Sequence, residues 1–187
     1  AGISSTCSTT GAFRLATDVL SDGPVDLFFI EFAVNDDQDA AHARRECIRG
    51  MEGILRHALM HNPEMDIVVT YFVNPGMLET LQSGETPLSI EAHESVAVQY
   101  NVTTVNLAAE IARQISADQL TWKEYGGTHP APRGNRICAD MIKGMLDAAW
   151  AEPIAASARS KSHEVPGDPI DRFSYVNGRF VTADQIQ

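Results

Sequence analysis

The sequence predicts an α/β fold, with a parallel β-sheet lying between two layers of helices. Two observations lead to this prediction. Short runs rich in Val, Ile and Phe, without polar alternation, are typical of strands buried on both faces. Stretches with helical periodicity separate these runs, and strands that alternate with helices form βαβ units. With 187 residues, of which 44% are hydrophobic, the chain can bury one core of ordinary size.

Three strands are expected. The first, 26–34, and the second, 66–73, are apolar and are bounded by Pro or Asn. The third, 101–107, gives a weaker signal, because its β-branched run is only Val-Thr-Thr-Val. Helices are expected around these strands, where apolar residues recur every three or four positions. Their predicted ranges are 11–20, 40–61, 89–100, 108–115 and 134–150.

The carboxyl ends of the predicted strands carry polar residues. Asn35 and Asp36 follow the first strand, and Asn74 follows the second. Ligands of open parallel sheets bind outside the carboxyl ends of the strands. Segment 74–86 is long for a connection in a compact domain, so it is a candidate substrate-binding loop.

The C-terminal part of the chain differs in character. The periodic pattern ends at Trp150, which bounds a main domain over 1–150, and residues 151–168 read as a linker. Two alternating runs within 173–181 flank Asn177-Gly178, the strongest short signal for a β-hairpin. Because a lone hairpin is marginal in water, 169–187 is expected to begin a β-rich unit that continues past Gln187.

Composition narrows the class of partner. The net charge of −11 argues against nucleic acid and anionic membrane surfaces. No apolar run reaches the length of a transmembrane helix, so no membrane insertion is expected. Three cysteines without metal-like spacing indicate core residues, and neither a metal nor another cofactor is expected. The chain opens at Ala1, in what reads as the end of a strand, so we expect a preceding segment that would carry any targeting signal.

Three separated segments resemble motifs of one family. Residues 1–6 (Ala-Gly-Ile-Ser-Ser-Thr), 33–36 (Ala-Val-Asn-Asp) and 126–130 (Gly-Gly-Thr-His-Pro) follow the order and spacing of the later motifs of a GDSL-type esterase of the SGNH hydrolase superfamily. The resemblance covers roughly residues 1–150. It implies a three-layer α/β/α sandwich with a flavodoxin-like parallel sheet. The first strand of that sheet, and the Gly-Asp-Ser motif with the nucleophilic serine, are missing from this sequence.

The resemblance also implies roles for three residues. His129 would be the general base, while the Asn35 amide and the Ser5 backbone N–H would donate to the oxyanion. Two of these residues also have a purely structural interpretation. Asn35 can end a strand and cap a helix, and His129 can be a turn residue before Pro130. The order of the three motifs favours the functional interpretation.

The sequence departs from the family pattern at three positions. Ser5 and Ala33 replace glycines, and Gly126 stands where the triad Asp is expected. Without that Asp, a backbone carbonyl or a carboxylate such as Glu124 must accept the other ring N–H of His129. We predict a carbonyl, because two consecutive glycines let the backbone approach closely.

The function that follows is hydrolysis of small acyl or carbohydrate O-acyl esters through an acyl-enzyme, with the serine outside this sequence. A small-molecule ester or a glycan is then the expected partner, and family analogy suggests secretion or the cell envelope. Two alternatives stay open: a lipid or thioester acylhydrolase, and a non-catalytic glycan-binding or scaffold domain. The sequence fixes no oligomeric state.

Two further patterns concern structure. Glu31 interrupts an apolar strand, and a buried carboxylate needs a partner, for which Arg14 is the candidate. His57 and His61 share one face of the long helix without a third ligand, so a solvated helix face is favoured over a metal site. His42, His93 and His163 have no setting comparable to that of His129.

Overall fold

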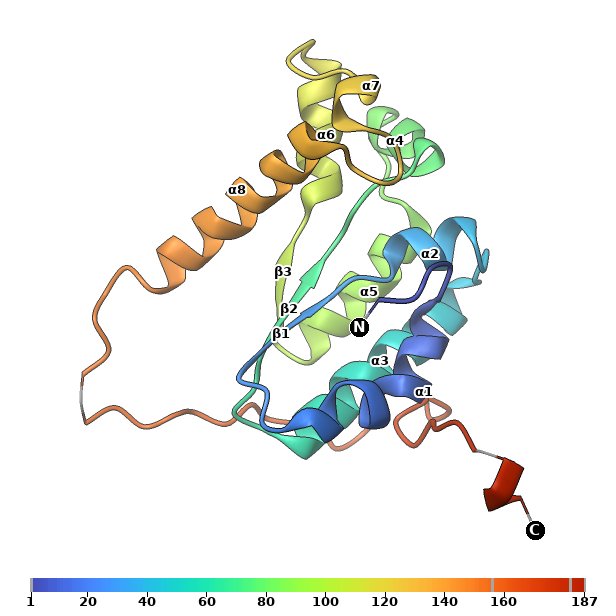
Figure 1. Ribbon diagram of the computed structural model, residues 1–187, viewed down its shortest axis with the longest axis vertical. Helices are drawn as coiled ribbons and strands as arrows, with labels where there is room; N and C mark the ends of the chain where they lie inside the picture. The colour runs from blue at the N-terminus through green and yellow to red at the C-terminus, as the bar shows by residue number, and fades with distance from the viewer. Residues whose placement is uncertain (1, 156, 182, 187) are drawn as a thin grey trace.

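The structure is a computed structural model that describes residues 2–155, 157–181 and 183–186. Strands β1 (Leu27–Ile30), β2 (Asp66–Thr70) and β3 (Thr103–Val105) form a parallel sheet in the order β1-β2-β3 (Figure 1). The predicted parallel sheet is therefore confirmed, with each strand shorter than expected.

Helices flank this sheet. α1, α3 and α5 lie against one face, and α8 crosses the other face (Figure 1). The helices are α1 (Ser8–Asp18), α2 (Ala33–Gln38), α3 (Arg44–His61), α4 (Pro75–Gln82), α5 (Leu88–Gln99), α6 (Leu107–Ser116), α7 (Trp122–Tyr125) and α8 (Pro132–Ala149). Two single turns of 3₁₀ helix, η1 (Leu20–Asp22) and η2 (Ala183–Gln185), complete the described chain.

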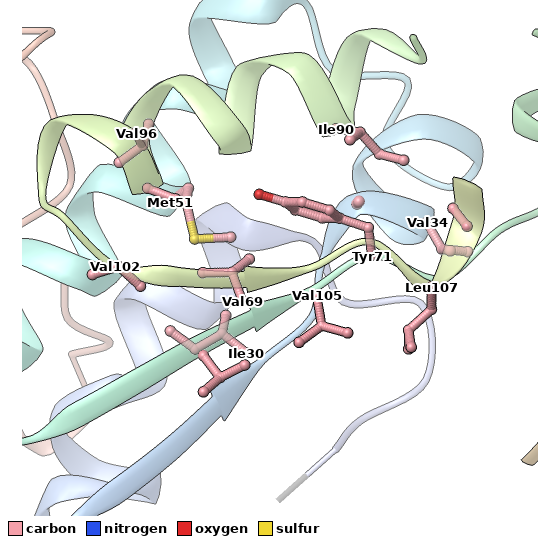
Figure 2. Close-up of a cluster of buried hydrophobic side chains, with 14 of the residues drawn as sticks. Ile30, Val34, Met51, Val69, Tyr71, Ile90, Val96, Val102, Val105 and Leu107 are labelled. Carbon is pink, nitrogen blue, oxygen red and sulfur yellow. The ribbon is translucent and has the colours of Figure 1, made fainter. Parts of the chain in front are cut away.

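The core lies between the sheet and helices α3 and α5. Ile30 of β1 is in register with Val69 of β2, so that both side chains point to the same face. Met51 of α3 and Val96 of α5 pack over them, and both are fully buried (Figure 2). This packing fixes the carboxyl ends of the strands, where the predicted site residues lie.

Two segments at those ends are helical, contrary to prediction. β1 ends at Ile30, and the residues from Ala33 onward form α2, so Asn35 does not end a strand. A short apolar run does not distinguish strand from helix by periodicity alone. The predicted loop 74–86 is mostly α4, because Asn74 accepts the Met77 N–H at 2.9 Å and a proline follows it.

The predicted hairpin around Asn177-Gly178 is wrong, since residues 173–181 form turns without a strand. The segment makes local turn bonds, such as Gly178 N–H to the Tyr175 carbonyl, and is held to α3. The Tyr175 N–H donates to the Arg49 carbonyl at 3.1 Å, and Arg49 pairs with Asp171 at 2.9 Å. Helix α3 thus offers hydrogen bonds that an isolated hairpin would have to make with itself. The division of the chain at 150 and 168 stays a prediction, and Gln187 lies outside the described residues.

The ion pair predicted between Glu31 and Arg14 is not formed between these two described residues. The Arg14 Nε donates to Asp18 at 2.7 Å, because the two residues are one turn apart on α1. Glu31 accepts the Val34 N–H at 3.3 Å instead. Among the described helices, none is long and apolar enough to cross a bilayer.

Candidate active site

Asn35 lies in the short helix α2, directly beyond the carboxyl end of β1 (Figure 1). The side chain is half-buried, and its amide donates to Asp39 Oδ2 at 2.9 Å. The side-chain amide nitrogen of Asn carries two hydrogens, so one of them remains available to donate to another acceptor.

Ser5 lies in the opening turn before α1. It is exposed and has a φ of +55°, in the left-handed region that glycine adopts most easily. The positive φ explains why the family motif has glycine at this position. Ser5 adopts the same backbone conformation at a cost in conformational energy. Ala1, the first residue of the same motif, lies outside the described residues.

His129 lies in the turn that joins α7 to α8. The Ala131 N–H donates to the Tyr125 carbonyl at 2.8 Å and closes this turn. The His129 side chain is exposed, and no described residue forms a hydrogen bond with it, so the predicted carbonyl acceptor is not in place.

Gly126 is required by the same turn. Its φ is +109°, and a Cβ at this position would lie 2.7 Å from Ala131 Cα. A side chain at 126 would thus collide with the backbone. The position where the family motif has Asp cannot hold one in this conformation.

The turn before α1, helix α2 and the turn between α7 and α8, which carry the three predicted residues, lie toward the carboxyl end of the sheet (Figure 1). No hydrogen bond among the described residues joins Ser5, Asn35 and His129 to one another. The three segments therefore lie at the end of the sheet where a ligand is expected, and they are held there by hydrogen bonds of residues other than Ser5, Asn35 and His129.

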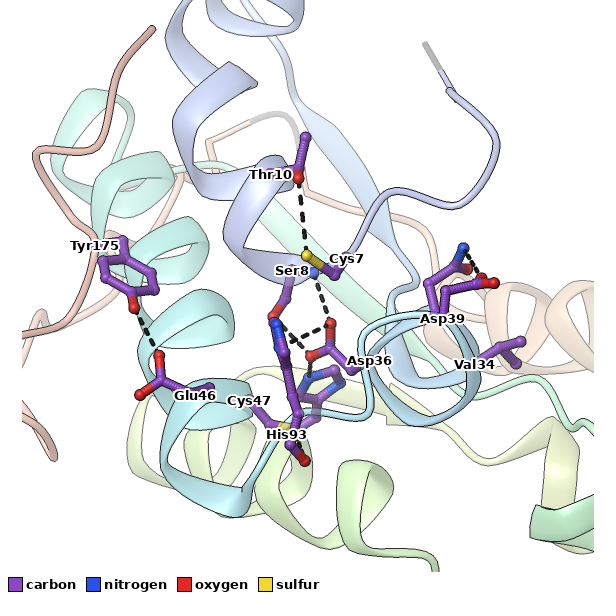
Figure 3. Close-up of polar contacts among 12 residues, drawn as sticks. Cys7, Ser8, Thr10, Val34, Asp36, Asp39, Glu46, Cys47, His93 and Tyr175 are labelled. Carbon is purple, nitrogen blue, oxygen red and sulfur yellow. Dashed lines mark hydrogen bonds and ion pairs between the residues drawn. The ribbon is translucent and has the colours of Figure 1, made fainter.

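Sequence reasoning missed the polar cluster that surrounds Asp36. Ser8 donates to both carboxylate oxygens, its N–H to Oδ1 at 2.7 Å and its hydroxyl to Oδ2 at 2.6 Å. His93 Nε2 lies 2.9 Å from Oδ2 (Figure 3). All three residues are fully buried. This cluster, which we call the Asp36 cluster, joins α1, α2 and α5.

The sequence indicated no setting for His93 comparable to that of His129, whereas the structure places His93 in a buried polar cluster. His93 lies on the buried face of α5, where a histidine among Ile, Ala and Val needs a polar partner. That polar residue on an apolar face was the only signal in the sequence. His42 was placed on the long helix, but α3 begins at Arg44, and His42 Nδ1 lies 3.6 Å from Asp36 Oδ1.

Charge and burial compete at Asp36. Burial raises the pKa of the carboxyl, but hydrogen bonds and attraction from His93, with the hydrogen bonds from Ser8, outweigh it, so the pKa lies below its ordinary value of 3.8. Burial, together with the nearby Asp36 charge, raises the pKa of the Cys47 thiol to about 12. The carboxylate is thus ionised at neutral pH, and Cys47 stays a neutral thiol.

The same cluster contains donor atoms that could hold a metal. One ligand atom each from Cys7, Asp36 and His42 lies within 4.8 Å of the others, and so do those from Asp36, Cys47 and His93. Mixed sulfur, nitrogen and oxygen sets of this kind suit zinc. However, both Asp36 oxygens already accept hydrogen bonds at 2.6–2.9 Å, which satisfies the carboxylate without an ion.

Two more side chains hold α2 in place. Asp37 accepts from Asn74 Nδ2 at 2.8 Å, which ties α2 to the N-terminus of α4. Glu31 accepts the Val34 N–H in the first turn of α2. Burial raises the pKa of Glu31 to about 7, and this outweighs the backbone N–H groups that favour its charged form.

Residues 1–137 match the GDSL-like lipase/acylhydrolase family. The match spans both the Asn35-Asp36 segment and the His129 turn. The chain belongs to this family. The predicted resemblance is thereby confirmed, and the fold, a parallel sheet flanked by helices, is consistent with it.

Two solved structures resemble this GDSL-family chain. Both are of a two-domain esterase active on acetylated mannans, and one was co-crystallised with mannopentaose. The TM-scores are 0.70 and 0.68 at 24% identity, with 92% and 89% of this chain covered. The chain spans 41% and 42% of those chains, so the likeness concerns the fold. No curated protein sequence matches the chain.

Proposed function

We propose that this GDSL-family chain contributes to a serine ester hydrolase that acts on small acyl esters, carbohydrate O-acetyl esters first among them. The proposed architecture is a three-layer α/β/α sandwich with a flavodoxin-like sheet. A further strand would pair with the outer edge of β1, and it would bring the nucleophilic serine on a Gly-Asp-Ser segment that this sequence does not contain.

The observation that carries the proposal is the common position of three separate segments. The Ser5 turn, α2 with Asn35, and the His129 turn all lie at the carboxyl end of one parallel sheet, where such folds bind ligands (Figure 1). The likeness to an esterase active on acetylated mannans supports acetylated carbohydrate as the substrate class.

In the proposed reaction the serine oxygen attacks the ester carbonyl while His129 accepts the serine proton. The Asn35 amide and the Ser5 N–H donate to the oxyanion, and one such donor contributes about 3–4 kcal/mol to the transition state. The alcohol leaves with the proton from His129, and water then releases the acyl group by the same steps in reverse. No described residue orients the imidazole, so we expect slower turnover than in a full triad.

A non-catalytic glycan-binding or scaffold domain is the second candidate. It is favoured by the unpartnered His129 and by the turn at Gly126, which leaves no room for an acid. A lipid or thioester acylhydrolase has no such support. Met77 and Leu78, which would make the segment after β2 apolar toward a lipid, are buried in the core.

The decisive experiment substitutes His129 in the protein that carries a Gly-Asp-Ser segment ahead of residues 1–187, called here the serine-containing protein. His129→Ala should lower kcat on p-nitrophenyl acetate by about 100- to 10,000-fold, with KM changed only a few-fold. His61→Ala, at the exposed end of α3, is the matched control and should keep full activity. Retained activity in His129→Ala would sink the base assignment, and an inactive parent protein would favour the non-catalytic domain.

The 187-residue chain by itself should not hydrolyse p-nitrophenyl acetate above the buffer rate. Turnover that disappears on Ser4→Ala or Ser5→Ala would instead place the nucleophile in the opening turn.

A further inference from the structure

We propose that Ser8 and His93, which lie outside all the motif segments, are positioning residues that act through Asp36 to hold the two oxyanion donors in one geometry. This inference rests on the proposed function, since it concerns the same site. It assigns to the buried Asp36 cluster a role in catalysis that the motif residues cannot fill alone.

The first step of the argument is the position of Asp36 in the chain. It directly follows Asn35, and Ser8 lies three residues after Ser5. The Asp36 carboxylate therefore joins the two segments that carry the two predicted donors. Ser8 contributes two bonds, at 2.7 Å and 2.6 Å, so that both its backbone and its side chain are fixed relative to α2 (Figure 3).

The second step concerns α2 itself. Helices shorter than about 12 residues are marginal on their own, so the orientation of this six-residue helix depends on its tertiary contacts. Its fully buried polar contact is the Asp36 carboxylate, whose Oδ2 is contacted both by the Ser8 hydroxyl from α1 and by His93 Nε2 from α5. Loss of either donor would let α2 shift, and Asn35 would shift with it.

The third step is the state of His93. The ring is fully buried, and only Nε2 has a partner, because Nδ1 makes no hydrogen bond with the part of the chain that the structure describes. Burial of an unsatisfied ring nitrogen is unfavourable. A residue retained for stability alone would be better replaced by an apolar one of similar size, whereas a positioning role for Asp36 requires the donor.

The fourth step is the room made for Ser8. A Cβ on Gly50 of α3 would lie 2.8 Å from the Ser8 carbonyl carbon and closer still to its side chain. Glycine at this position thus allows α1 to approach until Ser8 reaches Asp36. The cluster thus joins three helices, and a fourth, α3, leaves the room for it.

The test uses two substitutions of His93 in the serine-containing protein. His93→Gln keeps an N–H that can donate to Asp36, and His93→Leu fills similar space without a donor. We expect His93→Leu to lower kcat on p-nitrophenyl acetate by about 10- to 100-fold with KM changed only a few-fold, and His93→Gln to restore most of it. Ser8→Ala should reproduce the loss seen in His93→Leu.

Controls separate positioning from general destabilisation. Glu52 of α3 is, like Asp36, a fully buried carboxylate, and it accepts hydrogen bonds from the C-terminal segment. Glu52→Gln should lower the melting temperature without lowering kcat. Equal kcat in the Leu and Gln variants of His93, or a kcat loss in Glu52→Gln as large as in His93→Leu, overturns the inference. If the serine-containing protein itself does not hydrolyse p-nitrophenyl acetate, the proposed function fails. If His129→Ala is inactive while His93→Leu and Ser8→Ala are both fully active, only the positioning role fails.

Discussion

Asp36 and Glu52 are both fully buried carboxylates with similar partners, and they serve different parts of the molecule. Asp36 accepts from Ser8 and His93 and holds the segments at the carboxyl end of the sheet. Glu52 accepts the N–H groups of Ile170 and Asp171 at 2.6 Å and 3.0 Å, and so fixes the C-terminal segment to α3. Buried carboxylates thus hold the segments of the candidate site in one place and anchor a distant segment in the other.

Helix α3 contributes to both regions through two glycines one turn apart. Gly50 gives room to Ser8, and Gly53 gives room to Tyr175, whose carbonyl carbon would lie 2.8 Å from an added Cβ. Because both glycines are buried in one helix, substitutions at these two positions form a matched pair. The comparison predicts that changes around Asp36 affect catalysis, whereas changes around Glu52 affect only stability.

Removal of the carboxylates should give the largest effects. Asp36→Ala leaves the Ser8 and His93 donors buried without an acceptor, so we expect a loss of about 3–5 kcal/mol in the free energy of unfolding. Glu52→Ala leaves two backbone N–H groups and the Tyr100 hydroxyl without their acceptor and should cost about 1–3 kcal/mol. Urea denaturation of the 187-residue chain measures both. If the Glu52 variant proves the less stable of the two, the comparison has the wrong order.

The second effect is a pH dependence from Glu31. Its raised pKa means that between pH 4.5 and about 7 the folded chain holds a proton that the unfolded chain has released. Stability should therefore fall as pH rises through this range. The upper limit is about 3.5 kcal/mol, at about 1.4 kcal/mol per pH unit, and partial exposure of the side chain makes the fall smaller. Melting temperatures from pH 4.5 to 8 should show this slope, and Glu31→Gln should remove it. An unchanged slope in the variant would assign it to another group.

The glycine pair should give losses no larger than that of Glu52→Ala. Gly50→Ala and Gly53→Ala each gain helix propensity but overpack their contacts, with a net cost of about 1–3 kcal/mol. Limited proteolysis distinguishes them: Gly53→Ala should expose 163–181 to cleavage, and Gly50→Ala should not. Early cleavage there in both variants would show that the two contacts of α3 are coupled.

The sheet and five of the helices could be predicted because apolar runs and helical periodicity are local signals. α2 was missed because Ala33 and Val34 continue an apolar run, and nothing local distinguishes a last strand residue from a first helical turn. The hairpin failed for a related reason: the Asn-Gly signal is local, while the Tyr175 N–H bonds to the Arg49 carbonyl of α3 instead of to a partner strand.

The candidate site divides in the same way. Ser5, Asn35 and His129 could be proposed because each lies in a short motif. The Asp36 cluster could not, since its members lie 28 and 57 residues from Asp36 and only the fold brings them together. Gly126 differs from both groups. The sequence shows that glycine replaces the motif Asp, but only the structure shows that a side chain there would collide with Ala131.

The most direct test of the account is the effect of Asn35 on turnover in the serine-containing protein. Asn35→Ala should lower kcat on p-nitrophenyl acetate by about 100- to 1,000-fold with KM little changed, because an oxyanion donor acts on the transition state. Asn106→Ala removes an exposed Asn that caps α6 through the Ala109 N–H, and it is the matched control, expected to keep its kcat. Equal kcat in the two variants would contradict the account, because Asn35 would then be only a residue of α2.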